Sequence, residues 1–270
     1  EKKTIYTRLL SIDNKNSYQI GSVDNYVNLL PGESKSFNSK LYVGPKVQAE
    51  ITDLAPGLAL TVDYGVLTFL AAPLFWVLEK IHIIFGNWGW LIIMLTVLIK
   101  IVFFKLSESS YKSMAKMKKL TPRMTALKER FGDDKKQFSE ALMKIYKEEK
   151  VNPLGGCLPI LIQIPVFIAL YWVIIESVEM RHAPFVGWIV DLSSADPLYI
   201  LPVLMGLSMY AQQKLNPAPT DPMQAKIFLT LPFVFTFLFA TFPSGLVLYW
   251  VTNNILSIAQ QYVINKRIIS

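Results

Sequence analysis

A lysine inside an apolar segment is the residue of this sequence best placed to do chemistry. Lys100 lies in the run 87–106, and a rise of about 1.5 Å per residue places it roughly 18 Å along a helix from Trp88. An ionisable group at that depth in a bilayer is costly and faces protein or water instead of lipid. Thr96 lies four residues earlier, on the same helical face. The alternative is snorkelling, in which the long stem carries the ammonium to the inner headgroups.

Polar side chains also recur in the last apolar run, 245–265. At a spacing of four residues they are Tyr249, Asn253, Ser257 and Gln261, with Gln260 alongside. Gln163 adds an amide to another apolar run. Such groups can act simply as hydrogen-bond glue between helices, but together with Lys100 they favour a water-containing groove. No Asp or Glu lies in the interior of any apolar run, so the lysine charge is available to a visiting anion, and an ion-coupled transporter is disfavoured.

Residue types for other chemistry are scarce. The sequence has 2 histidines and 1 cysteine, with no metal-ligand cluster and no nucleophile beside a base. It also has no glycine-rich phosphate loop followed by Lys and Ser or Thr. Cys157 cannot form an internal disulfide, and we expect it to be a small buried packing group. We therefore expect no catalytic residue, no metal and no cofactor, and hence a protein that is not an enzyme.

The composition predicts a membrane protein. Of the 270 residues, 52% are hydrophobic and 17% are charged, whereas ordinary soluble domains have about 25% charged residues. Five apolar runs approach the 20 residues that cross a bilayer, and they are 87–106, 154–176, 197–213, 227–242 and 245–265. The third and fourth are short, which implies little tilt or a locally thinned bilayer.

The distribution of charge predicts the orientation of these spans, because Lys and Arg near span ends stay in the cytoplasm. Residues 105–150 contain 13 Lys or Arg and 7 Asp or Glu, so this segment is expected inside. The acidic loop 177–196 is then periplasmic and the loop 214–226 cytoplasmic. Residues 1–86 are expected in the periplasm and the C-terminus in the cytoplasm.

The segments outside the spans differ in character. Residues 1–57 are typical of a soluble β-rich domain, with strand patterns at Tyr18 to Val23 and Lys40 to Val43. Residues 58–86 show a helical apolar period, which predicts an amphipathic helix on the outer membrane surface. The alternative for this helix is an additional span. The chain begins at Glu1 without a methionine or signal peptide, so we expect an upstream targeting segment to be missing.

Residues 107–153 predict a basic helical hairpin. One helix is expected to end at Gly132 and a second to end before Asn152 and Pro153. Four methionines provide either an adaptable apolar surface or the packing between the two helices, and these are Met114, Met117, Met124 and Met143. The excess of cations favours binding to acidic surfaces, ribosomal RNA included, without a signal for DNA.

Two motifs carry a family resemblance. Lys147 to Phe167 reads KEEKVNPLGGCLPILIQIPVF and Phe242 to Trp250 reads FPSGLVLYW, with Asn87 to Gly89 ahead of the charged span. Over about residues 60–265 the chain resembles the YidC family of bacterial membrane protein insertases. The resemblance implies an α-helical membrane protein with five transmembrane helices, a cytoplasmic hairpin and an interfacial helix. It also implies that residues 1–55 are the end of a periplasmic β-sandwich domain.

The resemblance also implies a site. Its five helices surround a hydrophilic groove, and Lys100 occupies the position where family members commonly carry arginine. Arginine keeps its proton when desolvated, whereas lysine can lose it. Residues that match or adjoin groove-lining positions are Thr96, Gln163, Tyr249, Trp250, Asn253 and Ser257. Trp250 replaces a tyrosine seen in relatives.

The mechanism that follows is insertion of a nascent membrane protein without ATP. Its acidic tail enters the groove, attracted by Lys100, while its apolar segment slides along the third and last spans into lipid. Implied partners are nascent membrane proteins, the ribosome, the Sec translocon and the lipid bilayer, with no small-molecule cofactor and no DNA. The alternatives are a small-solute transporter and a purely structural assembly factor.

Overall fold

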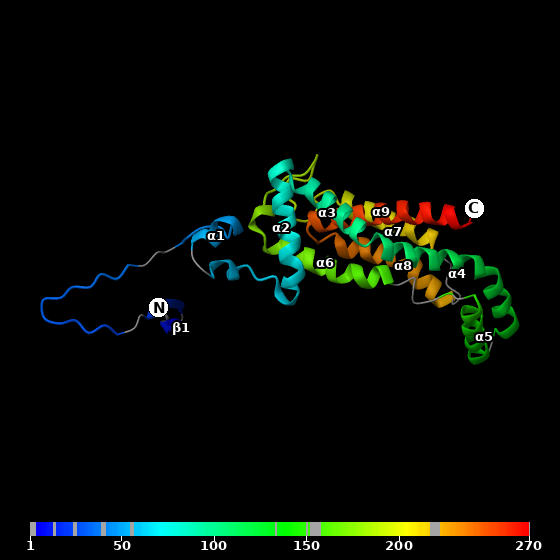
Figure 1. Ribbon diagram of the computed structural model, residues 1–270, viewed down its shortest axis with the longest axis horizontal. Coiled ribbons are helices and arrows are strands. Elements are labelled where there is room, and N and C mark those ends of the chain that lie inside the picture. Colours follow the sequence, from blue (N-terminus) through cyan, green and yellow to red (C-terminus); the bar gives the residue numbers. More distant parts are fainter. Residues whose placement is uncertain are drawn as a thin grey trace. The chain divides into compact units, whose positions relative to one another are not determined.

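The computed structural model describes residues 4–12, 15–23, 26–38, 42–54, 57–132, 134–149, 151, 158–216 and 222–269 (Figure 1). The chain divides into two compact units, Glu1–Gly44 and Pro45–Ser270. Cys157, expected to be a buried packing group, lies outside the described residues.

The first unit contains an antiparallel β-hairpin. Its strands are β1 (Thr4–Ile12) and β2 (Lys15–Val23), and they pair from Thr4 opposite Val23 to Ile12 opposite Lys15. The strand pattern at Tyr18 to Val23 therefore lies in a strand. The strand expected at Lys40 to Val43 is wrong for residues 42 and 43, which have no strand partner in the described part of the chain, while 40 and 41 lie outside it.

The second unit begins earlier than the domain boundary expected at residue 57. Its first helix is α1 (Gln48–Leu54), followed by the short 3₁₀ helices η1 (Leu58–Thr61) and η2 (Gly65–Leu67). The Lys46 Nζ lies 3.5 Å from the Glu176 Oε2, and the Gln48 N–H donates to the Glu179 Oε1 at 2.9 Å. Ile51 is buried in the main core. These contacts attach the segment from Pro45 to the helical unit, which explains the shifted boundary.

Helix α2 (Thr68–Phe85) crosses one end of the bundle, whereas α3 (Trp88–Val102), α6 (Leu158–Glu176) and α9 (Ser244–Ile269) run along its length (Figure 1). One face of α2 is buried against α3 and α6 through Ala71, Phe75 and Leu78. The opposite face exposes large apolar side chains, among them Phe69, Trp76, Ile83 and Ile84. The exposed face of α2 is thus suited to lipid.

Helix α9 is the centre of the bundle. It packs against α3, α4 (Phe104–Phe131), α6 and α7 (Ile200–Leu215), and α7 in turn packs against α8 (Pro222–Phe239). The core is built largely from Leu, Ile and Val side chains, including Leu91, Leu170, Ile174, Leu246 and Val247. The N-terminal half of α9 is consequently enclosed by protein.

Length and composition single out few of these helices as membrane spans. Within the described residues, the segment Gly65–Phe85 is long and apolar enough to cross a membrane, and so is the pair Trp88–Val102 and Phe104–Phe131 if the two count as one bent span. Leu161–Glu176 and Ala225–Phe239 are shorter apolar helices. The count of five spans therefore stays a prediction.

Capping groups set the first residues of α3 and α7, which differ from the starts of the expected spans. The Asn87 side chain accepts from the N–H groups of Gly89 and Trp90, which starts α3 at Trp88. The buried Asp196 carboxylate accepts from the Leu198 and Leu201 N–H groups. Helix α7 therefore begins at Ile200 instead of 197, because carboxylates satisfy the free N–H groups at a helix start.

The basic hairpin consists of α4 and α5 (Lys135–Glu148), which pack against each other at the end of the bundle away from α2 (Figure 1). Met117 and Met124 lie in one apolar cluster with the α5 residues Leu142 and Ile145. Met114 instead packs with Tyr111 and Ile264, and Met143 is 48% exposed. The methionines are thus divided: two join the helices, one attaches α4 to α9, and one is at the surface.

Candidate functional site

A bend between α3 and α4 creates the environment of Lys100. Helix α3 ends at Val102, and the chain turns by 69° into α4. The Phe103 N–H still donates to the Ile99 carbonyl at 3.0 Å, so the last turn of α3 is closed before the bend. Lys100 lies in that last turn. The expected span 87–106 is therefore not one straight helix, and its final residues belong to α4.

The Lys100 ammonium is held by a neutral partner. Its Nζ donates to the Ser257 Oγ of α9 at 2.7 Å, and the Ser257 Oγ donates to the Asn253 carbonyl at 2.7 Å. In the described part of the chain, no carboxylate lies within ion-pair distance of Lys100. The charge is thus positioned without being neutralised.

Tyr111 of α4 completes this arrangement. It is 3% exposed and hydrogen-bonded to Ser257. A hydroxyl has one proton and two acceptor lone pairs, so Ser257, which donates to Asn253, accepts from both Lys100 and Tyr111. Burial raises the pKa of Tyr111 above its usual value. Tyr111 is therefore a neutral donor at physiological pH.

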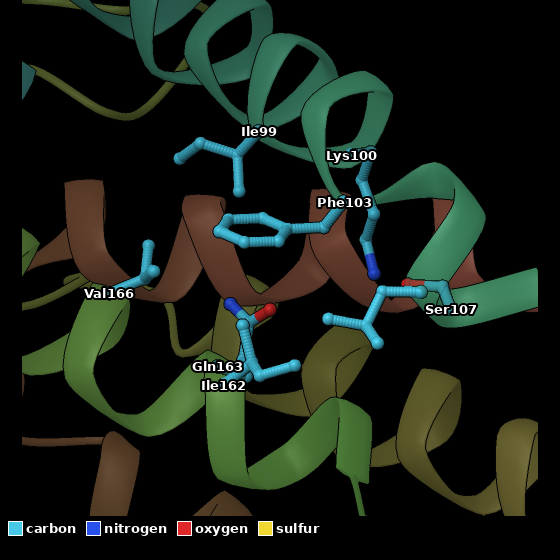
Figure 2. A pocket seen from close by; sticks show the side chains of 8 residues that line it. Ile99, Lys100, Phe103, Ser107, Ile162, Gln163 and Val166 are labelled. Atoms are coloured by element: carbon cyan, nitrogen blue, oxygen red, sulfur yellow. The ribbon is translucent and has the colours of Figure 1, made fainter. Parts of the chain in front are cut away.

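A narrow cleft lies beside Lys100, between the α3–α4 bend and α6. It is lined by Ile99, Lys100, Phe103, Leu106, Ser107, Ile162, Gln163 and Val166. Figure 2 shows Lys100 and Phe103 projecting from the end of α3 on one side and Gln163 and Ile162 of α6 on the other. Its volume of about 20 Å³ is enough for roughly one water molecule. The cleft is mostly closed in this conformation.

Gln163 links the cleft to the core of the bundle. Its Nε2 donates to the Tyr249 hydroxyl of α9, in a very close contact. Tyr249 is completely buried, so it does not line the cleft but fixes the amide that does. Two cleft residues are thus hydrogen-bonded to α9, Gln163 through Tyr249 and Lys100 through Ser257.

The other residues expected in the groove lie elsewhere. Thr96 is 1% exposed, and its hydroxyl donates to the Ile92 carbonyl at 2.6 Å inside its own helix. Trp250 packs in an aromatic cluster with Phe167, Phe235 and Phe239. Asn253 reaches the site only through its backbone carbonyl. The structure therefore brings Lys100, Gln163, Ser257 and Tyr249 into two hydrogen-bonded pairs and leaves Thr96 and Trp250 outside the cleft.

The polar residues further along α9 bond to neighbouring helices. The Asn254 amide donates to the Ser208 hydroxyl and the Gln261 amide to the Asn216 side-chain oxygen, both at 2.9 Å. Both α9 side chains are buried. These are interhelical hydrogen bonds of the kind offered as the alternative to a groove. The stripe residue Gln261 thus bonds between helices, whereas the groove stays a prediction.

Phe103 and Ser107, which line the cleft, and Tyr111, which bonds to Ser257, escaped the sequence analysis. The sequence has neither Pro nor Gly between residues 90 and 121, and sharp helix kinks usually accompany one of them. The bend at Phe103 therefore left no signal.

As for metals, the described residues contain no group of three or more His, Cys, Asp or Glu able to hold an ion.

Comparison with known families and proteins gives consistent matches. The family described as 60Kd inner membrane protein matches residues 80–270, and the YidC periplasmic domain matches residues 1–77. Two similar relatives are both named membrane protein insertase YidC. The one from Thioalkalivibrio sulfidiphilus is 60% identical over 99% of this chain and 48% of its own length. The one from Nitrosococcus oceani is 61% identical over 89% of this chain and 44% of its own length.

A solved structure is also similar. It is described as an active YidC insertase crystal structure with the first transmembrane domain resolved, and it matches with a TM-score of 0.59 and 31% identity. The match covers 73% of this chain and 47% of that one. The chain thus spans about half the length of the curated relatives and of the solved structure that it matches.

Proposed function

The chain belongs to the 60Kd inner membrane protein family, and we propose that it inserts nascent proteins into the inner membrane and assists their folding. The observation that carries this proposal is the Lys100 ammonium, which is bound to the neutral Ser257 hydroxyl in a cleft between helices. Its relatives named as insertases support the same activity.

The proposed topology has α3, α6, α7, α8 and α9 as spans, with the hairpin of α4 and α5 in the cytoplasm together with the C-terminus. Residues 1–86 lie in the periplasm, in keeping with the periplasmic-domain match over residues 1–77. Helix α2 lies on the outer membrane surface with its exposed apolar face towards lipid, because it crosses the bundle end instead of following the other helices (Figure 1).

Insertion begins when the acidic tail of a client reaches the cleft. A carboxylate replaces the Ser257 hydroxyl as the partner of Lys100, because the attraction between two opposite charges is added to the hydrogen bond. Ser257 keeps its bonds to Tyr111 and Asn253 during the exchange. The cleft widens for this step, since in its present form it holds only about one water.

The apolar segment of the client leaves along α6. An exit along the last span is unsuitable, because Leu246, Val247, Leu248 and Val251 in the outer half of α9 are buried. Helix α6 exposes Leu161, Ile164 and Ile168 next to the cleft residues Ile162 and Gln163. Burial of client side chains in lipid supplies the driving force without a cofactor or ATP.

The ribosome and the Sec translocon are the partners we propose besides the client. The basic hairpin is the surface for the ribosome, because Lys116, Lys118 and Lys144 are exposed there. Binding to ribosomal RNA through such cations weakens as salt concentration rises.

The test is complementation of cells depleted of the full-length protein, with two clients that differ only in the charge of the translocated tail. Lys100→Arg is expected to insert both clients. Lys100→Ala is expected to insert the acidic-tail client roughly tenfold less, which corresponds to one charge-assisted hydrogen bond of about 1.5 kcal/mol. The client with neutral tail residues is the control and should be unaffected.

Equal insertion of both clients by Lys100→Ala would rule out the charge step and favour a purely structural assembly factor. A small-solute transporter would instead show substrate-dependent flux in liposomes containing the purified protein. Flux without client insertion would reject the insertase proposal as a whole.

A further inference from the structure

A second, larger cleft lies on the surface of the helical bundle, between α7 and α8. It is lined by Val203, Gly206, Leu207, Tyr210, Leu229, Pro232, Phe233 and Thr236. Its volume is about 540 Å³, within the range of roughly 300–1,000 Å³ found for small-molecule sites. Apart from the Tyr210 and Thr236 hydroxyls, its side chains are apolar. None of these eight residues belongs to the Lys100 cleft.

The cleft is an outward-facing surface of two helices in contact. A Cβ atom on Gly206 would lie only 1.9 Å from the Thr236 Oγ1, so the helices touch at this point. The Thr236 hydroxyl donates to the Pro232 carbonyl at 2.8 Å, which satisfies the polar group inside its own helix. Leu207 is 61% exposed and Phe233 is 69% exposed, so the cleft faces whatever surrounds the bundle.

One end of the cleft carries positive charge. The Lys214 Nζ lies 5.2 Å from the centre of the Tyr210 ring, which itself lines the cleft. Lys226 lies three residues before the lining residue Leu229, on the facing helix, and both lysines are exposed. Residues 200–216 and 222–239 contain no Asp or Glu. The acid nearest in sequence, Asp221, lies outside the described residues.

We propose that this cleft binds an anionic phospholipid, with an acyl chain along the apolar lining and the phosphate between Lys214 and Lys226. The inference rests on the membrane location given by the proposed function, but it concerns a different site. An apolar cleft that ends in cations matches the two chemical parts of such a lipid, a hydrocarbon chain and a negative headgroup.

A client transmembrane helix is a poorer fit. A helix with side chains is about 10–12 Å in diameter, and the two cleft helices already touch at Gly206 and Thr236. A rigid cylinder would therefore rest on the rim, whereas a flexible acyl chain follows the lining. The apolar surface of a client also has no group that needs the two lysines, while a lipid phosphate does.

The test is retention of lipid by the purified full-length protein, measured by native mass spectrometry. Detergent-solubilised protein is loaded with phosphatidylglycerol or with phosphatidylcholine of the same acyl chains. The wild type is expected to retain phosphatidylglycerol preferentially. The double variant Lys214→Gln, Lys226→Gln is expected to lose that preference by roughly tenfold or more, because two lysines at a membrane surface each attract an anionic headgroup.

Two further variants distinguish the contribution of the apolar lining, which binds the acyl chain, from that of the two lysine charges. Leu207→Trp fills the cleft and should lower retention of both lipids. Lys266→Gln removes a lysine from the last turn of α9, outside the cleft, and should retain phosphatidylglycerol like the wild type. Unchanged gel-filtration profiles check that each variant is folded.

Three outcomes would overturn the proposal. They are equal retention of the two lipids by the wild type, an unchanged preference in the double lysine variant, and loss of client cross-linking in Leu207→Trp with lipid retention unchanged. The last would identify a client site instead. Lys100→Ala separates this proposal from the proposed function, since it should impair insertion of the acidic client and leave lipid retention intact.

Discussion

The arrangement around Lys100 depends on the hydroxyl group of Ser257. It donates to the Asn253 carbonyl and accepts from Lys100 and Tyr111, so its hydrogen-bonding capacity is fully used. Lys100 can leave this hydroxyl for a carboxylate without leaving a buried group unpaired, because Tyr111 remains bonded to it. The site therefore positions the Lys100 ammonium, and little free energy is lost when Lys100 leaves the Ser257 hydroxyl.

Replacing Ser257 removes the hydrogen bond that positions the Lys100 ammonium but keeps the ammonium itself. Ser257→Ala leaves the buried Tyr111 phenol without its partner, and we expect a loss of about 1–3 kcal/mol in the free energy of unfolding. Tyr111→Phe removes the phenol together with its need for a partner, so a smaller loss of about 0.5–1.5 kcal/mol is expected. Thermal unfolding in detergent measures both.

Insertion of the acidic-tail client is expected to stay within about twofold of wild type in both variants, since a charge-assisted bond to the client needs only the Lys100 ammonium. If Ser257→Ala lost insertion as fully as Lys100→Ala, the hydroxyl would be the working group and the charge step would be refuted.

At the scale of elements, the contact between α7 and α8 allows little change in volume. A Cβ on Gly206 would lie 1.9 Å from the Thr236 Oγ1 and 3.4 Å from the Pro232 carbonyl oxygen. Gly206→Ala is therefore expected to destabilise the protein by about 1–3 kcal/mol through overpacking. Gly206→Ala combined with Thr236→Ala should recover most of this loss, because the second substitution removes the clashing hydroxyl.

The matched single variant Thr236→Ala gives the baseline for this double-mutant cycle. Additive losses in the double variant would mean that the two side chains do not meet in the membrane. The fold would then differ from the structure at this interface.

The helices follow from the sequence more readily than their mutual arrangement does. Long apolar runs predicted α3, α6, α7, α8 and α9 to within a few residues, because each run needs a continuous buried or lipid-facing surface. A lone cation in an apolar run singled out Lys100, which lines the cleft, while its role stays a prediction. Helical period, however, gives the face of one helix and not its partner. Thr96 and Trp250, which the resemblance placed at or near a groove, do not line the Lys100 cleft.

At the scale of the whole molecule, the direction of α2 decides the topology. The segment Gly65–Phe85 is apolar and long enough to span, yet α2 crosses the end of the bundle opposite the α4–α5 hairpin (Figure 1). If α2 lies on the outer surface, residues 26–38 and the hairpin are on opposite sides of the membrane. If α2 crosses, the number of spans between them changes by one and both are on the same side.

Cysteine labelling distinguishes these two topologies. In a Cys157→Ser background, Ser36→Cys is expected to react with a membrane-impermeant maleimide in intact spheroplasts, and Lys144→Cys only after lysis. Both positions are exposed, so burial does not limit the reaction. Reaction of Lys144→Cys and Ser36→Cys under the same condition would make α2 a sixth span, because only an added crossing places both on one side. If the two cysteines instead react under different conditions, α2 does not cross the membrane. The exposed Phe69, Trp76 and Ile83 would then anchor α2 in the outer leaflet, as large apolar side chains do in interfacial helices.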